Sequence, residues 1–176
     1  MLRLYILGFA LALCGTLLGG CAAPITRVEP GAIPADFALA VVVYSPEHDA
    51  TVVAAMPRPM RPARYILEPD RLLRASLGPG ADVHLFPPPT RRLDGAQMQR
   101  LWEMAEQSGL LREGHPHRVP SEQGFASEFG RPIALITITR MGQRASAAIP
   151  LDAGDADAQA ALLLVDHLAE WAWVRR

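Results

Sequence analysis

Two stretches of the chain alternate apolar and polar residues on either side of a turn, and an amphipathic helical pattern follows each of them. The first stretch spans residues 64–78 and turns at Glu68-Pro69-Asp70-Arg71, where Pro and Asp suit the central positions of a type I turn. The second spans residues 132–151 and turns near Gly142. Hairpins that each precede a helix are typical of an antiparallel sheet with its helices on one face.

The remaining segments complete this architecture. Residues 36–45 are predicted to form a strand, with Phe37, Leu39, Val41 and Val43 on one face. A helix is predicted from Asp94, which can cap it with Gln97 at capping-box spacing, to Gly109, which can end it. Its expected buried stripe is Met98, Leu101, Trp102 and Ala105. The last helix, over residues 155–176, is expected to bury Ala158, Ala161, Leu162, Val165, Leu168, Ala169 and Ala172.

The sequence therefore predicts an α+β domain. Its expected core is an antiparallel sheet of about five strands, in the order strand, hairpin, helix, hairpin, helix, with two helices packed on one face. Residues 46–63 are expected to form an extended loop with a short strand near Thr51–Ala54, because the second half of this segment is rich in proline. Pro87–Pro89 are expected to lead to the first helix. Residues 112–131 are predicted to be one long loop, and loops of that length in small domains are often functional.

An export signal begins the chain. Arg3 provides a short positive region, and the apolar run Leu4–Leu18 has the length of a signal-peptide core, too short for a spanning helix. The run ends in Leu18-Gly19-Gly20-Cys21. This box resembles the lipobox of bacterial lipoproteins, which has an aliphatic residue, two small residues and then cysteine. Cys14 does not fit the pattern, because the bulky Leu13 precedes it.

The resemblance implies cleavage between Gly20 and Cys21, and lipidation of Cys21 with a diacylglycerol thioether and an N-linked acyl chain. Several acyl chains together hold a protein stably on a membrane. The residue after the cysteine is Ala22 rather than Asp, which implies the outer membrane, facing the periplasm. The predicted domains are a signal peptide at 1–20, a lipidated tether at 21–35 and a single α+β domain at 36–176.

Composition excludes several functions. The chain has 17 basic and 18 acidic residues, and its net charge of −1 provides no field for nucleic acid. Every basic residue is Arg, so a Walker P-loop, a Schiff-base lysine and a Ser-x-x-Lys acylase are all excluded. No serine lies in a Gly-x-Ser-x-Gly motif. We therefore expect a protein that is not an enzyme and has no cofactor.

One candidate site is a metal site. Glu113, His115 and His117 lie close together in the 112–131 loop, and imidazole and carboxylate are common metal ligands. A structural site normally needs four ligands, and no second cluster appears in the sequence. An ordinary solvated loop would have the same composition.

A second candidate is a partner surface. The basic proline tract carries Arg58, Arg61 and Arg64, which could dock on an acidic partner. Phe125 and Phe129 lie in the 112–131 loop and could contact a partner or pack in the core.

These features predict a membrane-anchored envelope lipoprotein whose domain is a non-catalytic binding or accessory module for an envelope protein or polymer. Its order of elements resembles that of small bacterial protease inhibitors of the emfourin type, which implies an exposed loop that lies in a protease cleft. One alternative is a metal-binding protein or metal-dependent enzyme that uses the 113–117 loop. Another is a purely structural spacer.

Overall fold

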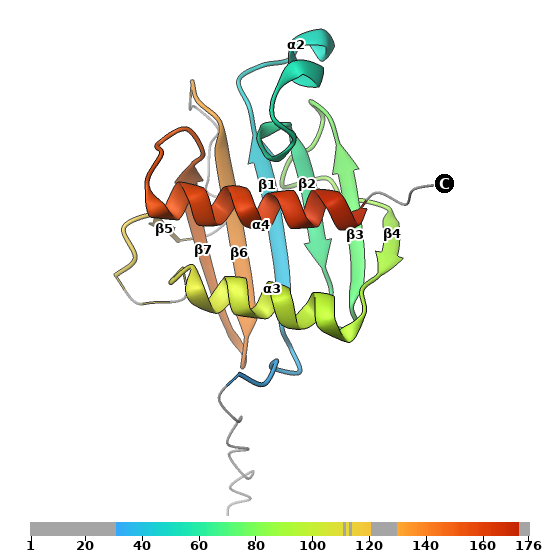
Figure 1. Ribbon diagram of the computed structural model, residues 1–176, viewed down its shortest axis with the longest axis vertical. Coiled ribbons are helices and arrows are strands. Elements are labelled where there is room, and N and C mark those ends of the chain that lie inside the picture. The colour runs from blue at the N-terminus through green and yellow to red at the C-terminus, as the bar shows by residue number, and fades with distance from the viewer. Residues whose placement is uncertain (1–30, 111, 113, 121–129, 173–176) are drawn as a thin grey trace, which may run out of the picture. The chain divides into compact units, whose positions relative to one another are not determined.

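The computed structural model describes residues 31–110, 112, 114–120 and 130–172, and within them seven strands form one antiparallel sheet (Figure 1). The strands are β1 (Ala38–Tyr44), β2 (Ala63–Leu67), β3 (Leu72–Leu77), β4 (Pro89–Arg92), β5 (Arg118–Val119), β6 (Ile133–Arg140) and β7 (Gln143–Pro150), in the order β4-β3-β2-β1-β6-β7-β5. The helices are α2 (Ala50–Ala55), the short 3-10 helix η1 (Arg58–Met60), α3 (Gly95–Gln107) and α4 (Ala156–Ala172). The predicted signal peptide with Gly20, and the predicted lipidation site Cys21, lie outside the described residues.

The predicted fold class is confirmed, with a larger sheet than expected. Helices α3 and α4 both lie across the same face of the sheet (Figure 1). The additional strands are edge strands: β4 pairs with β3, and the two-residue β5 pairs with β7. Strands this short have no alternation of their own, so the sequence pattern does not reveal them.

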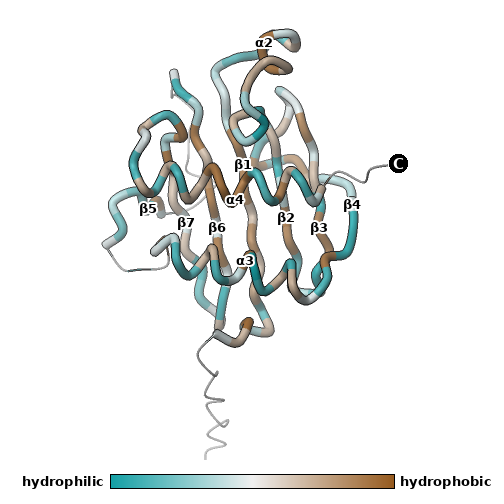
Figure 2. The backbone as a smooth tube through the Cα atoms, viewed as in Figure 1, coloured by the Kyte–Doolittle hydropathy of each residue, from teal (hydrophilic) through white to brown (hydrophobic). Residues whose placement is uncertain are grey.

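The core lies between the sheet and the two helices. The predicted faces of β1 and α3 are buried, and Phe37 packs edge-on against Trp102 with ring centroids 5.1 Å apart. In α4 the stripe differs from the prediction at two positions: Leu162 and Ala172 are only partly buried. Leu164, which was not predicted, is buried near Ile136 of β6. Figure 2 shows the hydrophobic residues concentrated along the central strands.

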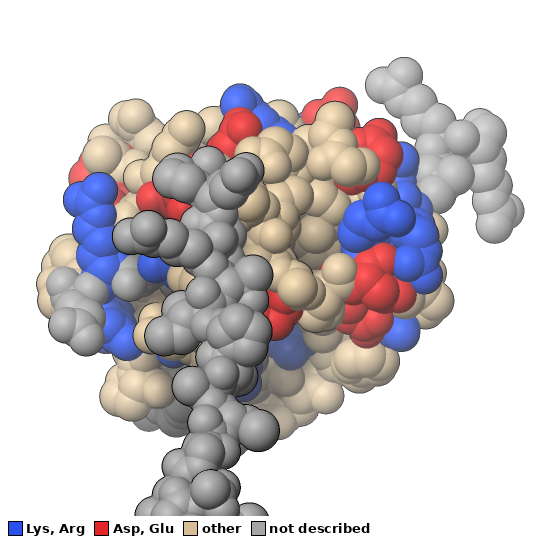
Figure 3. Space-filling model, turned by 90° about the horizontal axis from the view of Figure 1, so that it is seen from below, with Lys and Arg blue, Asp and Glu red and all other residues tan. Residues whose placement is uncertain are grey.

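Strand register gathers two turns at one end of the sheet. Leu39 near the start of β1 pairs with both Leu67, before the β2–β3 turn, and Ile138, before the β6–β7 turn. The first described residue, Gly31, lies at this end as well (Figure 1), which we call the Gly31 end. Figure 3 looks onto this end and shows basic and acidic side chains intermixed on it.

The opposite end, which we call the α2 end, carries α2 and η1 (Figure 1). Val43 near the end of β1 pairs with Ala63 at the start of β2, and Ala63 also pairs with Leu77 at the end of β3. The loop after β1, the loop before β2 and the segment after β3 therefore meet beside α2. The Gly31 end and these segments lie a full strand length apart.

Helix α2 corrects one prediction. Residues 50–55 are helical where the sequence predicts an extended loop with a short strand. The Asp49 carboxylate accepts hydrogen bonds from the backbone N–H groups of Thr51 and Val52, at 2.8 and 3.1 Å. This N-cap outweighs the preference of consecutive valines for extended structure. Arg64 also differs from prediction, because it is a buried residue of β2 rather than part of an exposed tract.

Three other segments differ from the predicted pattern. Pro87–Pro89 lead to helix α3 as predicted, but strand β4, which was not predicted, lies between them and the helix. Residues 112–131 are not a loop throughout, because β5 lies within them. Residues 31–35, which the sequence assigns to the tether, belong to the compact body, where Ile33 packs against the core.

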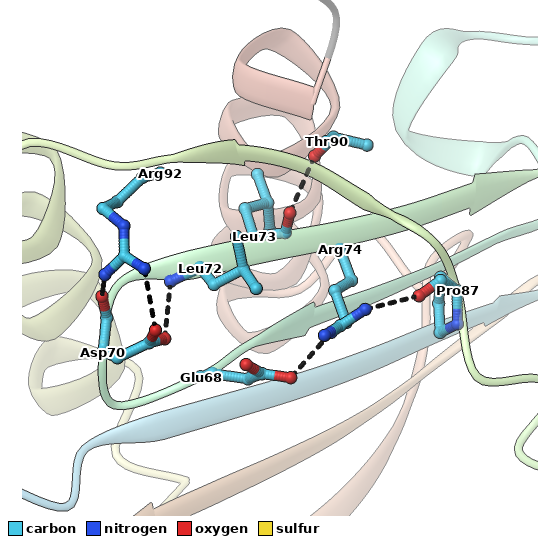
Figure 4. Close-up of polar contacts among 8 residues, drawn as sticks. All are labelled: Glu68, Asp70, Leu72, Leu73, Arg74, Pro87, Thr90 and Arg92. Atoms are coloured by element: carbon cyan, nitrogen blue, oxygen red, sulfur yellow. Dashed lines mark hydrogen bonds and ion pairs between the residues drawn. The ribbon is translucent and has the colours of Figure 1, made fainter.

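Side-chain contacts hold β4 on the sheet edge (Figure 4). Thr90 Oγ1 donates a hydrogen bond to the Leu73 carbonyl at 2.9 Å. Arg74 Nε donates to the Glu68 carboxylate at 2.6 Å, and Arg74 Nη1 donates to the Pro87 carbonyl at 3.4 Å. These contacts supplement the strand pairing, which is interrupted by a register shift between Leu73 and Arg74. A proline-rich edge strand needs such support, since proline donates no ladder hydrogen bond.

Candidate functional site

An apolar pocket of about 380 Å³ opens at the α2 end. Its walls come from α2, η1, the ends of β2 and β3, and the last turn of α4. Val53, Tyr65 and Ala169 are buried residues of its lining, and Leu77, which also lines it, is 43% exposed. Four consecutive elements between residues 50 and 77, together with the distant α4, thus build one hydrophobic depression.

A second, more polar pocket of about 430 Å³ adjoins the first. The two share Pro62 and Pro79 in their linings, so they lie side by side, and we call the two pockets together the groove. The polar pocket is lined by Ser45 and His48 of the β1–α2 loop and by Asp82 after β3. The two shared prolines make a stiff divider, because their φ angles are fixed by the ring.

Two arginines of the proline tract line the apolar pocket. Arg58 donates from Nε and Nη2 to Asp166 Oδ1 of α4, with distances of 2.9 and 2.7 Å. Arg61 donates from Nε to the Met56 carbonyl and from Nη2 to the Ala54 carbonyl, with distances of 2.9 and 2.8 Å.

The two arginines differ in charge balance. The carboxylate of Asp166 compensates the charge of Arg58. Among the described residues, no carboxylate lies within ion-pairing distance of Arg61, which bonds only to carbonyls at the end of α2. Arg61 therefore keeps a net positive charge at the pocket.

Tyr65 forms the floor of the apolar pocket, and its side chain is almost completely buried. Burial raises the pKa of the Tyr65 hydroxyl, with smaller opposing effects from Arg58, which lowers it, and Asp166, which raises it. The hydroxyl therefore stays protonated at neutral pH and can donate a hydrogen bond.

Apolar side chains also surround the pocket on the surface. In α2 only Val53 is buried, and the neighbouring Val52 is 48% exposed. With Leu77, it places two large exposed hydrophobic residues at the α2 end. Exposed apolar side chains around a concave apolar pocket are typical of a binding surface.

The structure brings two predicted metal ligands to a carboxylate in the first turn of α4. Nε2 of His115 and Nε2 of His117 each lie 3.6 Å from Asp157 Oδ2. His115 Nδ1 accepts a 3.3 Å hydrogen bond from the His117 backbone N–H, so in neutral His115 the proton belongs on Nε2, the nitrogen near Asp157. This arrangement joins the segment before β5 to α4.

Within the described part of the chain, no three His, Cys, Asp or Glu side chains are arranged to hold a metal ion. Glu113, Phe125 and Phe129 lie outside the described residues, so the predicted metal site and the aromatic partner surface stay predictions. Trp171 lies partly buried against the core and stacks on His167, with ring centroids 5.2 Å apart.

The search for membrane-spanning segments, applied to the described residues, finds no helix with the length and apolar character needed to cross a bilayer. No protein-family model matches the chain. A search of curated proteins finds no relative either. What the domain binds must therefore be inferred from its own residues.

The sequence pointed to Arg58 and Arg61 but not to the groove beside them. Tyr65, Leu77 and Ala169 belong to different elements, and only the tertiary fold makes them neighbours. One signal was present in the sequence: the nearly all-apolar segment after Asp49 stands in a region expected to be on the surface. An apolar surface segment with its own N-cap indicates a helix that serves binding as well as folding.

Proposed function

We propose that this chain is a lipid-anchored lipoprotein of the cell envelope whose domain is a non-catalytic binding module, and that the groove binds a segment of another envelope protein. The observation that carries the proposal is the apolar pocket, with Leu77 and the nearby Val52 exposed at the same end of the domain. A concave apolar pocket with a few polar groups is the usual form of a binding site.

The position of the groove supports this role. The segment that leads into β1 lies at the Gly31 end, and α2 lies at the opposite end (Figure 1). The residues that line the groove belong to the α2 end. A strand rises by about 3.3 Å per residue, so β1, with 7 residues, separates the two ends by about 20 Å. A partner in the groove would therefore lie at the opposite end of the body from the segment that leads into β1.

The polar side chains of the groove favour binding over catalysis. Asp82 Oδ1 accepts hydrogen bonds from the backbone N–H groups of His84 and Leu85. Ser45 Oγ lies 3.9 Å from Met56 Sδ. A catalytic relay needs a nucleophile hydrogen-bonded to a base, and a third group that orients the base. In the described residues, neither Ser45 nor Asp82 is hydrogen-bonded to His48.

Site-specific photo-cross-linking tests the proposal. A benzophenone side chain is placed at Val52, Leu77 or Leu163 of the full-length protein in its native envelope, and products are identified by mass spectrometry. Leu163, 49% exposed on α4, is the matched control. We expect one partner to be captured from Val52 and Leu77 and not from Leu163. Equal capture from Leu163, or no capture from either Val52 or Leu77, would contradict the proposal.

A further inference from the structure

We infer that the groove recognises the carboxyl terminus of its partner protein, with the apolar side chain of the last residue in the apolar pocket and its carboxylate on Arg61. This inference rests on the proposed function and specifies the chemistry of that same site.

The first step of the argument is the fixed cation at the pocket. The bonds from Arg61 to the carbonyls of Met56 and Ala54 hold its guanidinium in place on the end of α2. They use Nε and Nη2, and Nη1 has no hydrogen-bond partner among the described residues. A guanidinium that is already held in place loses little freedom when it binds a carboxylate. Arg58, in contrast, is already paired with Asp166.

The second step is the distance between charge and apolar surface. Arg61 lines the same pocket as Val53 and Tyr65. A ligand that satisfies both must carry a carboxylate and an apolar group close enough together to fit into one pocket. The last residue of a polypeptide does so, because its carboxylate and its side chain are attached to the same Cα. Charge complementarity and apolar burial then act on one residue.

The third step is the polarity of the adjoining pocket. Past Pro62 and Pro79 the lining changes to Ser45, His48 and Asp82. A peptide backbone that precedes the terminal residue would find hydrogen-bonding groups there. An alkyl chain of a fatty acid, which also pairs a carboxylate with apolar surface, would instead meet polar groups that it cannot satisfy. The groove therefore fits a polypeptide better than a fatty acid.

Peptide binding tests the inference. The probe is a fluorescent hexapeptide that ends in leucine, made with a free carboxyl terminus and as its amide, and titrated into the full-length protein in detergent micelles. A hydrogen bond to a charged group leads us to expect that the free acid binds about tenfold more tightly than the amide. Equal affinity for the two forms would overturn the carboxylate assignment. Tighter binding of laurate than of the free acid would overturn it in favour of an alkyl chain.

Variants separate the charge effect from the fold. Arg61→Gln should abolish the preference for the free acid, whereas Arg100→Gln, on the exposed side of α3, should keep it. Because Arg61 also bonds to α2, a second pair of variants at Leu77 leaves those bonds intact. Leu77→Glu should repel the peptide carboxylate and reverse the preference for the free acid. Leu77→Gln, which carries no charge, should not reverse it. An unchanged preference in both Arg61→Gln and Leu77→Glu would contradict the inference. If neither peptide binds while cross-linking from Val52 and Leu77 persists, the inference fails and the proposed function stands.

Discussion

Asp36 holds the β6–β7 turn through Gly142: its Oδ2 accepts a hydrogen bond from the Gly142 N–H at 2.6 Å, and its Oδ1 accepts one from the Met141 N–H at 2.6 Å. Both turn residues have positive φ angles, 46° at Met141 and 70° at Gly142. Positive φ is unfavourable for a residue with a side chain such as Met141. The carboxylate thus secures a strained turn and links it to the segment that leads into β1.

We expect Asp36→Asn to lower the melting temperature and to speed hydrogen exchange at residues 141 and 142. Asparagine has one acceptor oxygen in place of two, so one of the two turn N–H groups loses its partner. Asp152→Asn is the control, since Asp152 makes an exposed ion pair with Arg131, and such pairs contribute little. An equal effect of the two substitutions would show that Asp36 has no special role in the turn.

Acid should destabilise the domain through three aspartates. Backbone N–H groups, chiefly those of Gly142, Val52 and Leu72, hold the pKa values of Asp36, Asp49 and Asp70 below the ordinary 3.8. A depressed pKa stabilises the fold fully above about 3.8, and this contribution is lost as the pH falls through the lower folded-state value. Chemical denaturation at a series of pH values measures it.

The decisive comparison is the slope of stability against pH. We expect it to be positive below about pH 4 and shallower in Asp36→Asn, which removes one of the three groups. A variant with the slope of the parent protein would exclude a contribution from Asp36.

Alanine substitutions of core and surface leucines on the helices should differ sharply in their effect on the free energy of unfolding. Leu101 of α3 is 0% exposed, so Leu101→Ala should lower the free energy of unfolding by about 2–5 kcal/mol through lost burial and an internal cavity. Leu163→Ala, at a half-exposed site on α4, should change it by less than about 0.5 kcal/mol. Denaturant titration measures both. If Leu163→Ala lowered the free energy of unfolding as much as Leu101→Ala, Leu163 would have to be covered in solution.

The capping box of α3 gives a further stability prediction. Asp94 Oδ1 accepts a 2.8 Å hydrogen bond from the Gln97 N–H, and Gln97 Oε1 accepts one from the Asp94 N–H at 3.1 Å. Asp94→Ala should therefore lower the free energy of unfolding by about 1 kcal/mol. Asp94→Asn keeps an acceptor and should retain most of the stability. If both variants lose the same amount, the cap is not the cause.

The lipid anchor is tested by cell fractionation. Cys21→Ser removes the sulfur that would carry the diacylglycerol, so we expect the protein to move from the membrane fraction to the soluble fraction. Cys14→Ser is the internal control and should remain with the membranes, because Leu13 excludes Cys14 from the lipobox. Membrane retention of Cys21→Ser would refute lipidation at this position.

The sequence predicted elements whose signals are local. The capping box at Asp94, the turn at Gly142 and the buried face of β1 all depend on residues within one element or one turn. Strands β4 and β5 were not predicted, because they form only when β3 and β7 supply the partners. At α2, two valines favoured a strand, and the Asp49 cap decided for a helix.

The candidate site was predicted only as fragments. Arg58 and Arg61 drew attention as cations on a proline tract. Their significance depends on Asp166, which lies 108 positions from Arg58 in the sequence. Its carboxylate compensates the charge of Arg58 and leaves Arg61 with its positive charge. A sequence pattern contains no information on which of two similar arginines will meet a carboxylate on a distant helix.

The opposed positions of Gly31 and the groove also determine how the domain would carry mechanical load. A pull between the N-terminal tether and a bound partner would act along the length of β1, which lies between β2 and β6 in the middle of the sheet. The backbone hydrogen bonds of antiparallel strands run perpendicular to the strands. These hydrogen bonds would therefore be loaded in shear and would share the force, instead of breaking one after another.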